Sequence, residues 1–219
     1  MSHYDDYDDD DDDDDNGENS ESGEEQGSKE AKGMSALAAQ MLDTRTMIVA
    51  DEVSDQLYRR IATTLMLLER KDPKAPITVF VNSPGGSADS GFAIYDLFRF
   101  SPCTITTVAN GVVASAAVLI FLGSPPGLRL SLPNARFLLH QPSTATRGQA
   151  SDIDITAKEI IKLRRRYNEI VQEATGKEMA QVEKDSDRDF WLTAEESREY
   201  GLVNRIVTTR KELEEHGKR

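Results

Sequence analysis

The side chains of this sequence that could do chemistry are a serine, a histidine and an aspartate that lie far apart along the chain. A serine hydroxyl becomes a nucleophile when an imidazole takes its proton, and a carboxylate orients that imidazole and stabilises its cation. Ser115 is the candidate nucleophile and His140 the candidate base, because His3 and His216 lie in polar ends of the chain. Three candidate acids lie close together, and the residues alone do not choose among them: Asp185, Asp187 and Asp189.

Ser115 lies where a predicted strand, 104–108, breaks at Gly111 and an apolar run, 114–122, becomes long enough for a buried helix. A serine at the start of a helix can cap it by accepting a backbone N–H. It can also stand at a strand-to-helix turn as a nucleophile, beside free N–H groups and the positive end of the helix dipole. Both interpretations are open, and His140 can equally be a hydrogen-bonded core residue.

A glycine turn could supply the hydrogen-bond donors that such a reaction needs. The segment Asn82-Ser-Pro-Gly-Gly86 follows an apolar strand predicted over 77–81 and precedes a helix predicted over 88–100. Ligands of open α/β sheets sit at the carboxyl ends of the strands, and consecutive glycines permit positive φ and close backbone approach. The turn can therefore hold an oxyanion, or it can be a tight turn without a ligand.

The remaining elements alternate in a way that predicts an α/β domain with right-handed crossovers. Helical spacing and capping signals predict helices over 54–69, with Ser54 as N-cap, over 153–174, stopped by Gly176, and over 193–200, with a Thr193–Glu196 capping box. Further elements are a short helix at 37–42 and strands at 46–50, 128–132, 135–139 and 202–207. This arrangement can bring the serine, the histidine and an acid together at the strand ends.

The charge of the 219-residue chain is concentrated at its beginning. Residues 1–33 hold 15 of the 39 acidic residues and two of the 26 basic ones, so the net charge of −13 lies there and the rest of the chain is neutral. The aspartate run cannot bury enough apolar surface to offset its ordering entropy, which predicts a disordered acidic tail. Since the body has no basic surplus for phosphates, nucleic acid is not an expected partner.

Metals, disulfides and membranes are also not expected. The tail imitates the start of a calcium loop, but Gly23 stands where the bidentate carboxylate should be, so no metal or cofactor is expected. Cys103 is the only cysteine, which rules out an intramolecular disulfide. The longest apolar run is far short of the ~20 residues that span a bilayer, and no signal peptide is visible. We expect a cytoplasmic protein.

Four stretches of the sequence resemble the proteolytic subunit of the Clp protease, the ClpP family. They are Val81-Asn-Ser-Pro-Gly-Gly86, Gly111-Val-Val-Ala-Ser115, Leu139-His-Gln-Pro142 and residues 187–203. The resemblance implies a ClpP/crotonase-like α/β fold of repeated ββα units with a protruding handle helix. It also implies a serine peptidase domain at 34–208, between the acidic tail, 1–33, and a charged C-terminal tail, 209–219.

The same resemblance assigns roles to single residues. It implies that Ser115 is the nucleophile, His140 the general base and acid, and Asp189 the triad acid. The backbone N–H groups of Gly86 and Ala116 match the oxyanion hole. The family usually has methionine at the second of these positions, and alanine supplies the same backbone donor.

The resemblance further implies an assembly and partners. Asp187 and Arg188 match a pair that links neighbouring rings, and 149–175 matches the handle helix that joins two heptameric rings into a closed chamber. A homo-oligomer, expected to be a tetradecamer, would cut unfolded proteins and peptides inside it, served by an AAA+ unfoldase of the ClpX, ClpA or ClpC type. Phe80 matches an aromatic surface region used for that docking, or it is a core residue.

The beginning of the chain departs from the family pattern, and this keeps alternatives open. An Asp-rich tail and a Gly-Ser-Lys linker replace the usual axial hairpin. One alternative is therefore a catalytically weak structural or regulatory ClpP paralogue that assembles with an active subunit. A second is a crotonase-type acyl-CoA enzyme, which shares the fold. The tail charge itself predicts repulsion of acidic substrates at low salt.

Overall fold

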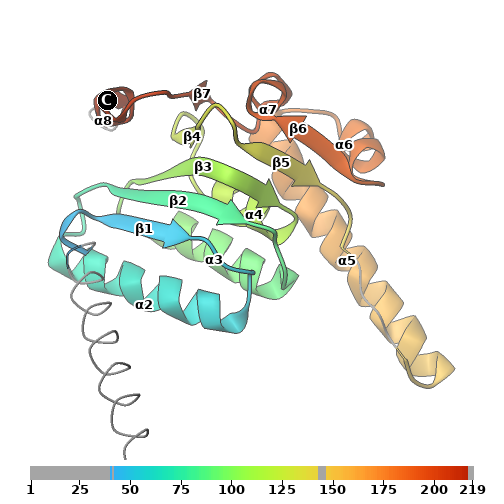
Figure 1. The fold of residues 1–219 in the computed structure, drawn as a ribbon. Coiled ribbons are helices and arrows are strands. Elements are labelled where there is room, and N and C mark those ends of the chain that lie inside the picture. Colours follow the sequence, from blue (N-terminus) through green and yellow to red (C-terminus); the bar gives the residue numbers. More distant parts are fainter. Residues whose placement is uncertain (1–39, 41, 143–146, 217–219) are drawn as a thin grey trace, which may run out of the picture. The chain divides into compact units, whose positions relative to one another are not determined.

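The computed structural model describes residues 40, 42–142 and 147–216 (Figure 1). The described residues from 42 onward form one compact unit. The acidic tail, the domain boundary at 34 and nearly all of the helix expected at 37–42 lie outside the described residues.

The described chain forms a mostly parallel sheet, which confirms the predicted fold class. Its strands are β1 Thr46–Val49, β2 Ile77–Ser83, β3 Ile105–Ala114, β4 Arg129–Ser131, β5 Arg136–Leu139, β6 Phe190–Thr193 and β7 Arg205–Ile206. The main path runs β1-β2-β3-β4-β7, β5 pairs with β3, and β6 pairs antiparallel with β5. The central strand β2 alternates buried with half-buried or exposed residues, and the first five residues of β3 are all buried, so the face of the sheet that packs on the helices is the buried one.

The helices are α2 Asp55–Lys71, α3 Ala88–Phe100, α4 Ala116–Leu122, α5 Ala150–Thr175, α6 Met179–Asp185, α7 Ala194–Tyr200 and α8 Arg210–His216. Figure 1 shows α2, α3 and α4 against one face of the sheet, and α5 running past the sheet edge. On α2 the buried residues recur at helical spacing, and the fully buried α4 lies within the main core.

The predicted helix ends are confirmed where capping chemistry marks them. The Ser54 hydroxyl accepts from the Leu57 N–H, and the Thr193–Glu196 capping box is complete. Gly176 ends α5 in the left-handed region at φ 71°. These local signals are strong because they satisfy backbone groups that a helix end leaves unpaired.

The third strand differs from the prediction, because β3 does not stop near 108 but continues to Ala114. Gly111 bends the strand at φ 104° instead of ending it, and the Asn82 side chain accepts from the Val112 N–H at 2.9 Å. The bend lets one strand serve two neighbours, since β3 pairs with β4 before Gly111 and with β5 after it. As a result α4 begins at Ala116, two residues later than predicted.

A smaller apolar cluster lies around Val108, Leu130 and Val207. Phe80 packs partly buried against it, with the Arg210 guanidinium 5.7 Å from the ring centre. Residues 210–216, predicted as part of a charged tail, form α8, and Leu213 packs on this cluster.

Candidate active site

Ser115 occupies a sharp turn between β3 and α4. Its backbone adopts φ 55° and ψ −124°, and Arg45 is the only other described non-glycine residue with positive φ. Such conformations cost about 1–3 kcal/mol and persist where the surroundings enforce them. The Ser115 hydroxyl makes no capping hydrogen bond to α4, so the helix-cap interpretation is wrong. The turn has the strand-to-helix form of a nucleophile elbow.

Two glycines bring a second loop against this turn. A Cβ added to Gly85 would lie 2.6 Å from both the Ser115 Cβ and the Ala114 carbonyl oxygen, so only glycine fits there. Gly86 at φ 142° is equally enclosed, because a Cβ there would overlap the Val53 carbonyl. Close backbone contact therefore fixes the 85–86 turn beside Ser115.

His140 directly follows β5 and Asp189 directly precedes β6, and because these strands pair antiparallel the two side chains meet. The His140 Nδ1 lies 3.1 Å from the Asp189 Oδ1. Their side chains are 29% and 65% exposed, so the imidazole is half-buried while the carboxylate faces solvent. The contact at Nδ1 leaves Nε2 free to act on another group, as a carboxylate-oriented imidazole requires.

The other two aspartates contact different partners. Asp185 accepts from the Tyr200 hydroxyl at 2.9 Å and from the Gln181 amide at 2.7 Å. Asp187 lies 3.9 Å from an Arg164 nitrogen, and its backbone carbonyl accepts from the Gln141 side chain. Of the three candidate acids, only Asp189 contacts the imidazole.

Ser115 and His140 border the same cavity, but no hydrogen bond joins their side chains. They are brought together because β3 and β5 pair in parallel, and Ser115 N–H bonds the Leu138 carbonyl at 3.0 Å. The cavity measures about 590 Å³. The serine and the His140–Asp189 pair thus share one site, with the proton-transfer contact still open.

The predicted backbone donors also border this cavity. Ala116 is the first residue of α4, where N–H groups have no acceptor within the helix. Val53 pairs with the 85–87 turn through two hydrogen bonds: its N–H donates to the Gly85 carbonyl, and its carbonyl accepts from the Ser87 N–H. The Gly86 N–H takes part in neither of these hydrogen bonds. Both residues line the cavity next to Ser115.

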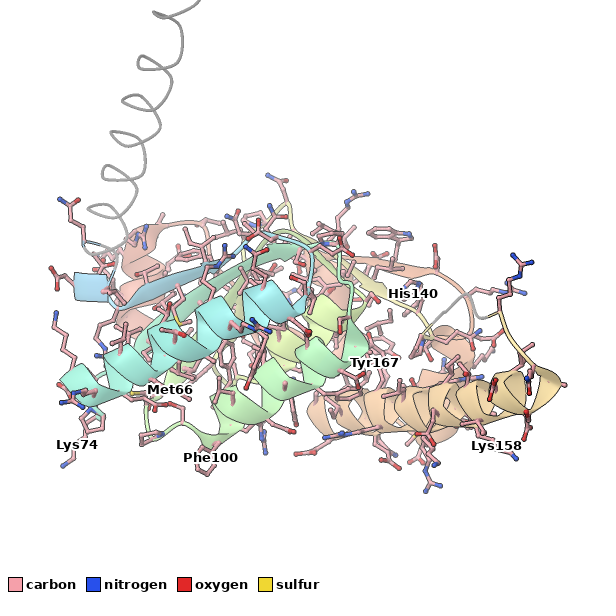
Figure 2. All side chains as sticks on the ribbon, turned by 90° about the horizontal axis from the view of Figure 1, so that it is seen from below. Met66, Lys74, Phe100, His140, Lys158 and Tyr167 are labelled. Atoms are coloured by element: carbon pink, nitrogen blue, oxygen red, sulfur yellow. The ribbon has the colours of Figure 1, made fainter. Side chains whose placement is uncertain are left out.

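The cavity walls are mainly apolar, with carboxylates at exposed positions. The apolar side chains come from α3, α4 and α5: Phe92, Leu119, Ile160 and Leu163. Asp89 and Glu159 add exposed carboxylates, and none of the described residues that line the cavity is lysine or arginine. Figure 2 shows His140 and Tyr167, which both line it. Burial raises the pKa of the Tyr167 phenol well above its ordinary value, so the hydroxyl stays protonated.

The expected ring-contact residues lie on the surface of the chain. Asp187 and Arg188 are both exposed, and Arg188 forms no salt bridge with another described residue. The pair is therefore open to contacts outside this chain.

Sequence reasoning missed part of this site. Helical spacing predicted a helix over 153–174, but it could not show that Ile160 and Tyr167 of this helix border a cavity. Gly85 was recognised within a glycine turn, while its contact with Ser115 depends on tertiary structure.

In the residues described, no cluster of three His, Cys, Asp or Glu side chains could hold a metal ion. Within the same ranges, no helix combines the length and apolar character needed to cross a membrane.

Comparisons with known proteins identify the family to which the chain is similar. A family model described as Clp protease matches residues 28–210. The chain is 41% identical over 191 residues to the ATP-dependent Clp protease proteolytic subunit 2 of Treponema denticola, covering 87% of this chain and 96% of that protein. It is 45% identical over 175 residues to the proteolytic subunit 3 of Rhizobium meliloti, covering 80% and 89%. A solved mutant of ClpP1 from Listeria monocytogenes matches with a TM-score of 0.75 and 40% identity, over 81% of this chain and 99% of that one.

Proposed function

Because this chain belongs to the Clp protease family, whose members are serine peptidases, we propose that it is a serine endopeptidase with Ser115 as its nucleophile. One observation carries the proposal: the strained Ser115 turn borders the same cavity as an imidazole held by Asp189. Its hydroxyl is not used in capping the helix that it precedes. A crotonase-type enzyme is set aside, since the matching family model is that of the Clp proteases.

In the proposed reaction His140 Nε2 takes the Ser115 proton as the hydroxyl oxygen attacks the peptide carbonyl. Asp189 holds the imidazole in the tautomer that leaves Nε2 unprotonated and stabilises the cation that forms. His140 then gives the proton to the leaving amine, and water releases the acyl group by the reverse sequence. The N–H groups of Gly86 and Ala116 receive the carbonyl oxygen as it becomes negative.

Proton transfer requires His140 Nε2 to come within hydrogen-bond reach of the Ser115 oxygen. Catalytic hydrogen bonds commonly tighten only in the substrate complex. The serine turn is enclosed by Gly85 and its neighbours, whereas Asp189 is exposed. We therefore assign the closing movement to the part of the chain that carries His140 and Asp189.

The proposal includes an oligomer that acts on unfolded chains. The relatives named above are proteolytic subunits of an ATP-dependent protease, which supports assembly and service by an AAA+ unfoldase. Helix α5 exposes large apolar side chains, Ile153, Ile155 and Ile161, that a second ring would bury. Asp187 and Arg188 would contribute contacts between rings, and a chamber of two heptameric rings fits these features.

A second candidate function is a subunit with weak catalysis that assembles with an active paralogue. The open contact between Ser115 and His140 favours it, and so do relatives numbered as subunits 2 and 3. Rings that never cleave peptides, even with a partner ATPase, would establish this alternative.

A peptidase assay tests the main proposal. The purified oligomer should cleave fluorogenic peptides, and Ser115→Ala should abolish turnover while the sedimentation profile stays unchanged. Ser54→Ala is the matched control, because it removes a serine that caps α2 and lies outside the cavity. Turnover that survives in Ser115→Ala would rule out Ser115 as the nucleophile.

A further inference from the structure

Next to the glycine turn lies a buried serine that the proposed reaction does not use. Ser83 is the last residue of β2 and is fully buried. Its hydroxyl donates to the Asp51 carbonyl at 2.6 Å and accepts from the Gly85 N–H at 3.2 Å. One side chain therefore joins two segments, the turn at 85–86 and the stretch that follows β1.

The stretch after β1 holds the same turn through its backbone. The Val53 N–H donates to the Gly85 carbonyl at 2.8 Å, and the Val53 carbonyl accepts from the Ser87 N–H at 2.7 Å. Ser83 bonds to Asp51, two residues before Val53, so its hydroxyl fastens this stretch as well as the turn. Both polar backbone groups of Gly85 are thereby held in place.

These contacts set the direction of the Gly86 N–H. A peptide unit is planar and trans, so its N–H points opposite to its C=O. The Gly85 carbonyl and the Gly86 N–H belong to one such unit, and the carbonyl is held toward Val53. The Gly86 N–H therefore points away from Val53, and Gly86 lines the cavity beside Ser115. The rotation of this single unit decides whether the N–H can reach an oxyanion in the cavity.

The role of Ser83 requires a small side chain that both donates and accepts. A hydroxyl supplies one donor together with accepting lone pairs. Alanine would leave the Asp51 carbonyl and the Gly85 N–H without these partners, and buried polar groups without partners are costly. The turn would then rotate or shift to regain hydrogen bonds, and the Gly86 N–H would move with it.

We propose that Ser83 is a positioning residue, whose hydroxyl holds the Gly85–Gly86 peptide unit so that the Gly86 N–H meets the oxyanion. The inference rests on the proposed peptidase function. Ser83 is not among the residues that line the cavity, so it acts through the turn and not on the substrate. The Gly86 N–H matters most when the carbonyl oxygen becomes negative, so a displaced N–H should lower kcat and leave KM nearly unchanged.

Steady-state cleavage of a fluorogenic peptide by Ser83→Ala tests this role. Rates are divided by the concentration of reactive sites, titrated with a fluorophosphonate, so that misfolded protein is not counted. We expect kcat per titrated site to fall about tenfold or more, because a lost oxyanion donor costs about 10²- to 10³-fold and a displaced donor costs less. A peptide boronate, whose tetrahedral adduct with Ser115 presents an oxygen to the same donors, should bind more weakly by a similar factor.

Ser124→Ala is the matched control. Ser124 is also a buried serine, and its hydroxyl bonds to the backbone carbonyls of Ile105 and Leu128. Ile105 begins β3, so this contact lies at the opposite end of the strand from Ser115. The control should lower thermal stability but keep the wild-type kcat per titrated site. An unchanged kcat per site in Ser83→Ala, or an equal loss in Ser124→Ala, would overturn the inference.

Should Ser83→Ala fail to assemble, Ser83→Cys is measured in the same way. Cysteine is close to serine in size, but its thiol is a weak donor and a weak acceptor. Its kcat per titrated site should fall by a smaller factor, and an unchanged value would overturn the inference. A wild type that cleaves no peptide would refute the peptidase function itself, which is a different result from an active wild type beside an equally active Ser83 variant.

Discussion

The two halves of the candidate site are built in different ways. The serine half is made of backbone: a strained residue, two enclosed glycines and the start of a fully buried helix. The histidine half is made of two side chains, His140 just after β5 and Asp189 just before the antiparallel β6, and its carboxylate is 65% exposed. The first half is complete within one chain. The second contains the His140–Asp189 contact but no hydrogen bond to Ser115, so in the proposed mechanism it is the half that substrate or assembly would move.

Removing the acid from the histidine half should give the largest loss. Asp189→Asn leaves the site almost unchanged in shape, but an amide does not hold the imidazole in the required tautomer or stabilise its cation. We expect kcat to fall about 10³- to 10⁴-fold, measured by steady-state peptide cleavage. Asp185→Asn is the control, since Asp185 contacts Tyr200 and Gln181 and not His140. Equal losses in the two variants would contradict the choice of acid.

Disturbing the serine half through its backbone should give the next largest effect. Gly85→Ala places a Cβ 2.6 Å from the Ser115 Cβ, so the turn must shift, and a displacement of about 1 Å can cost 10²-fold in rate. Gly127→Ala is a matched control, because Gly127 also has φ 94° but a Cβ there meets nothing within 4 Å. If both substitutions reduce kcat/KM alike, backbone strain alone explains the loss and close packing at Ser115 is irrelevant.

The Thr193–Glu196 capping box, which begins at the end of β6 in the histidine half, should make the stability of the fold depend on pH. The pKa of Glu196 lies below its ordinary value, because the carboxylate accepts from the Thr193 N–H and hydroxyl at the end of β6. Because its pKa is lowered on folding, the ionised Glu196 carboxylate stabilises the folded state at neutral pH, and this stabilisation is lost as the pH falls through the folded-state pKa. Acid unfolding followed by circular dichroism should therefore be less steep in Glu196→Gln.

Glu195→Gln should keep the wild-type acid unfolding curve, because Glu195 pairs with Arg198 and does not join the capping box. If the acid unfolding curves of Glu196→Gln and the wild type coincide, Glu196 makes no pH-dependent contribution to stability.

The smallest effect is expected from the acidic tail. Its charge of −13, repeated in every subunit of the proposed ring, should repel acidic peptides. Deleting residues 1–33 should raise their cleavage about twofold or more at low salt, and the difference should shrink near 0.15 M salt, where the screening length is about 8 Å. Identical rates at low salt would leave the tail without this role.

Local signals in the sequence predicted those parts of the fold that depend on local chemistry. Ser54, Thr193 and Gly176 marked helix ends correctly, because capping satisfies backbone groups within a few residues. The short elements β6 and α6 were missed. β6 has only four residues and forms by antiparallel pairing with β5, and the seven-residue α6 contains charged residues and packs through the buried Val182. The end of β3 was predicted too early at Gly111, because glycine occurs both at bends within strands and at the ends of strands.

The same distinction between local and long-range information applies to the candidate site. Ser115 and His140 were identifiable as single residues at strand ends, whereas the residues alone left three aspartates open. Only the pairing of β5 with β6 shows which carboxylate meets the imidazole. The hydrogen bond from Ser83 to Asp51 was beyond prediction, because it joins segments that only the tertiary structure brings together.

The account depends on Ser115 being activated by His140, and covalent labelling measures this most directly. A fluorophosphonate probe, followed by peptide mapping, should give one adduct on Ser115 in the wild-type oligomer and almost none in His140→Ala. An adduct on Ser115 that forms equally fast without His140, or an adduct on another residue, would contradict the account.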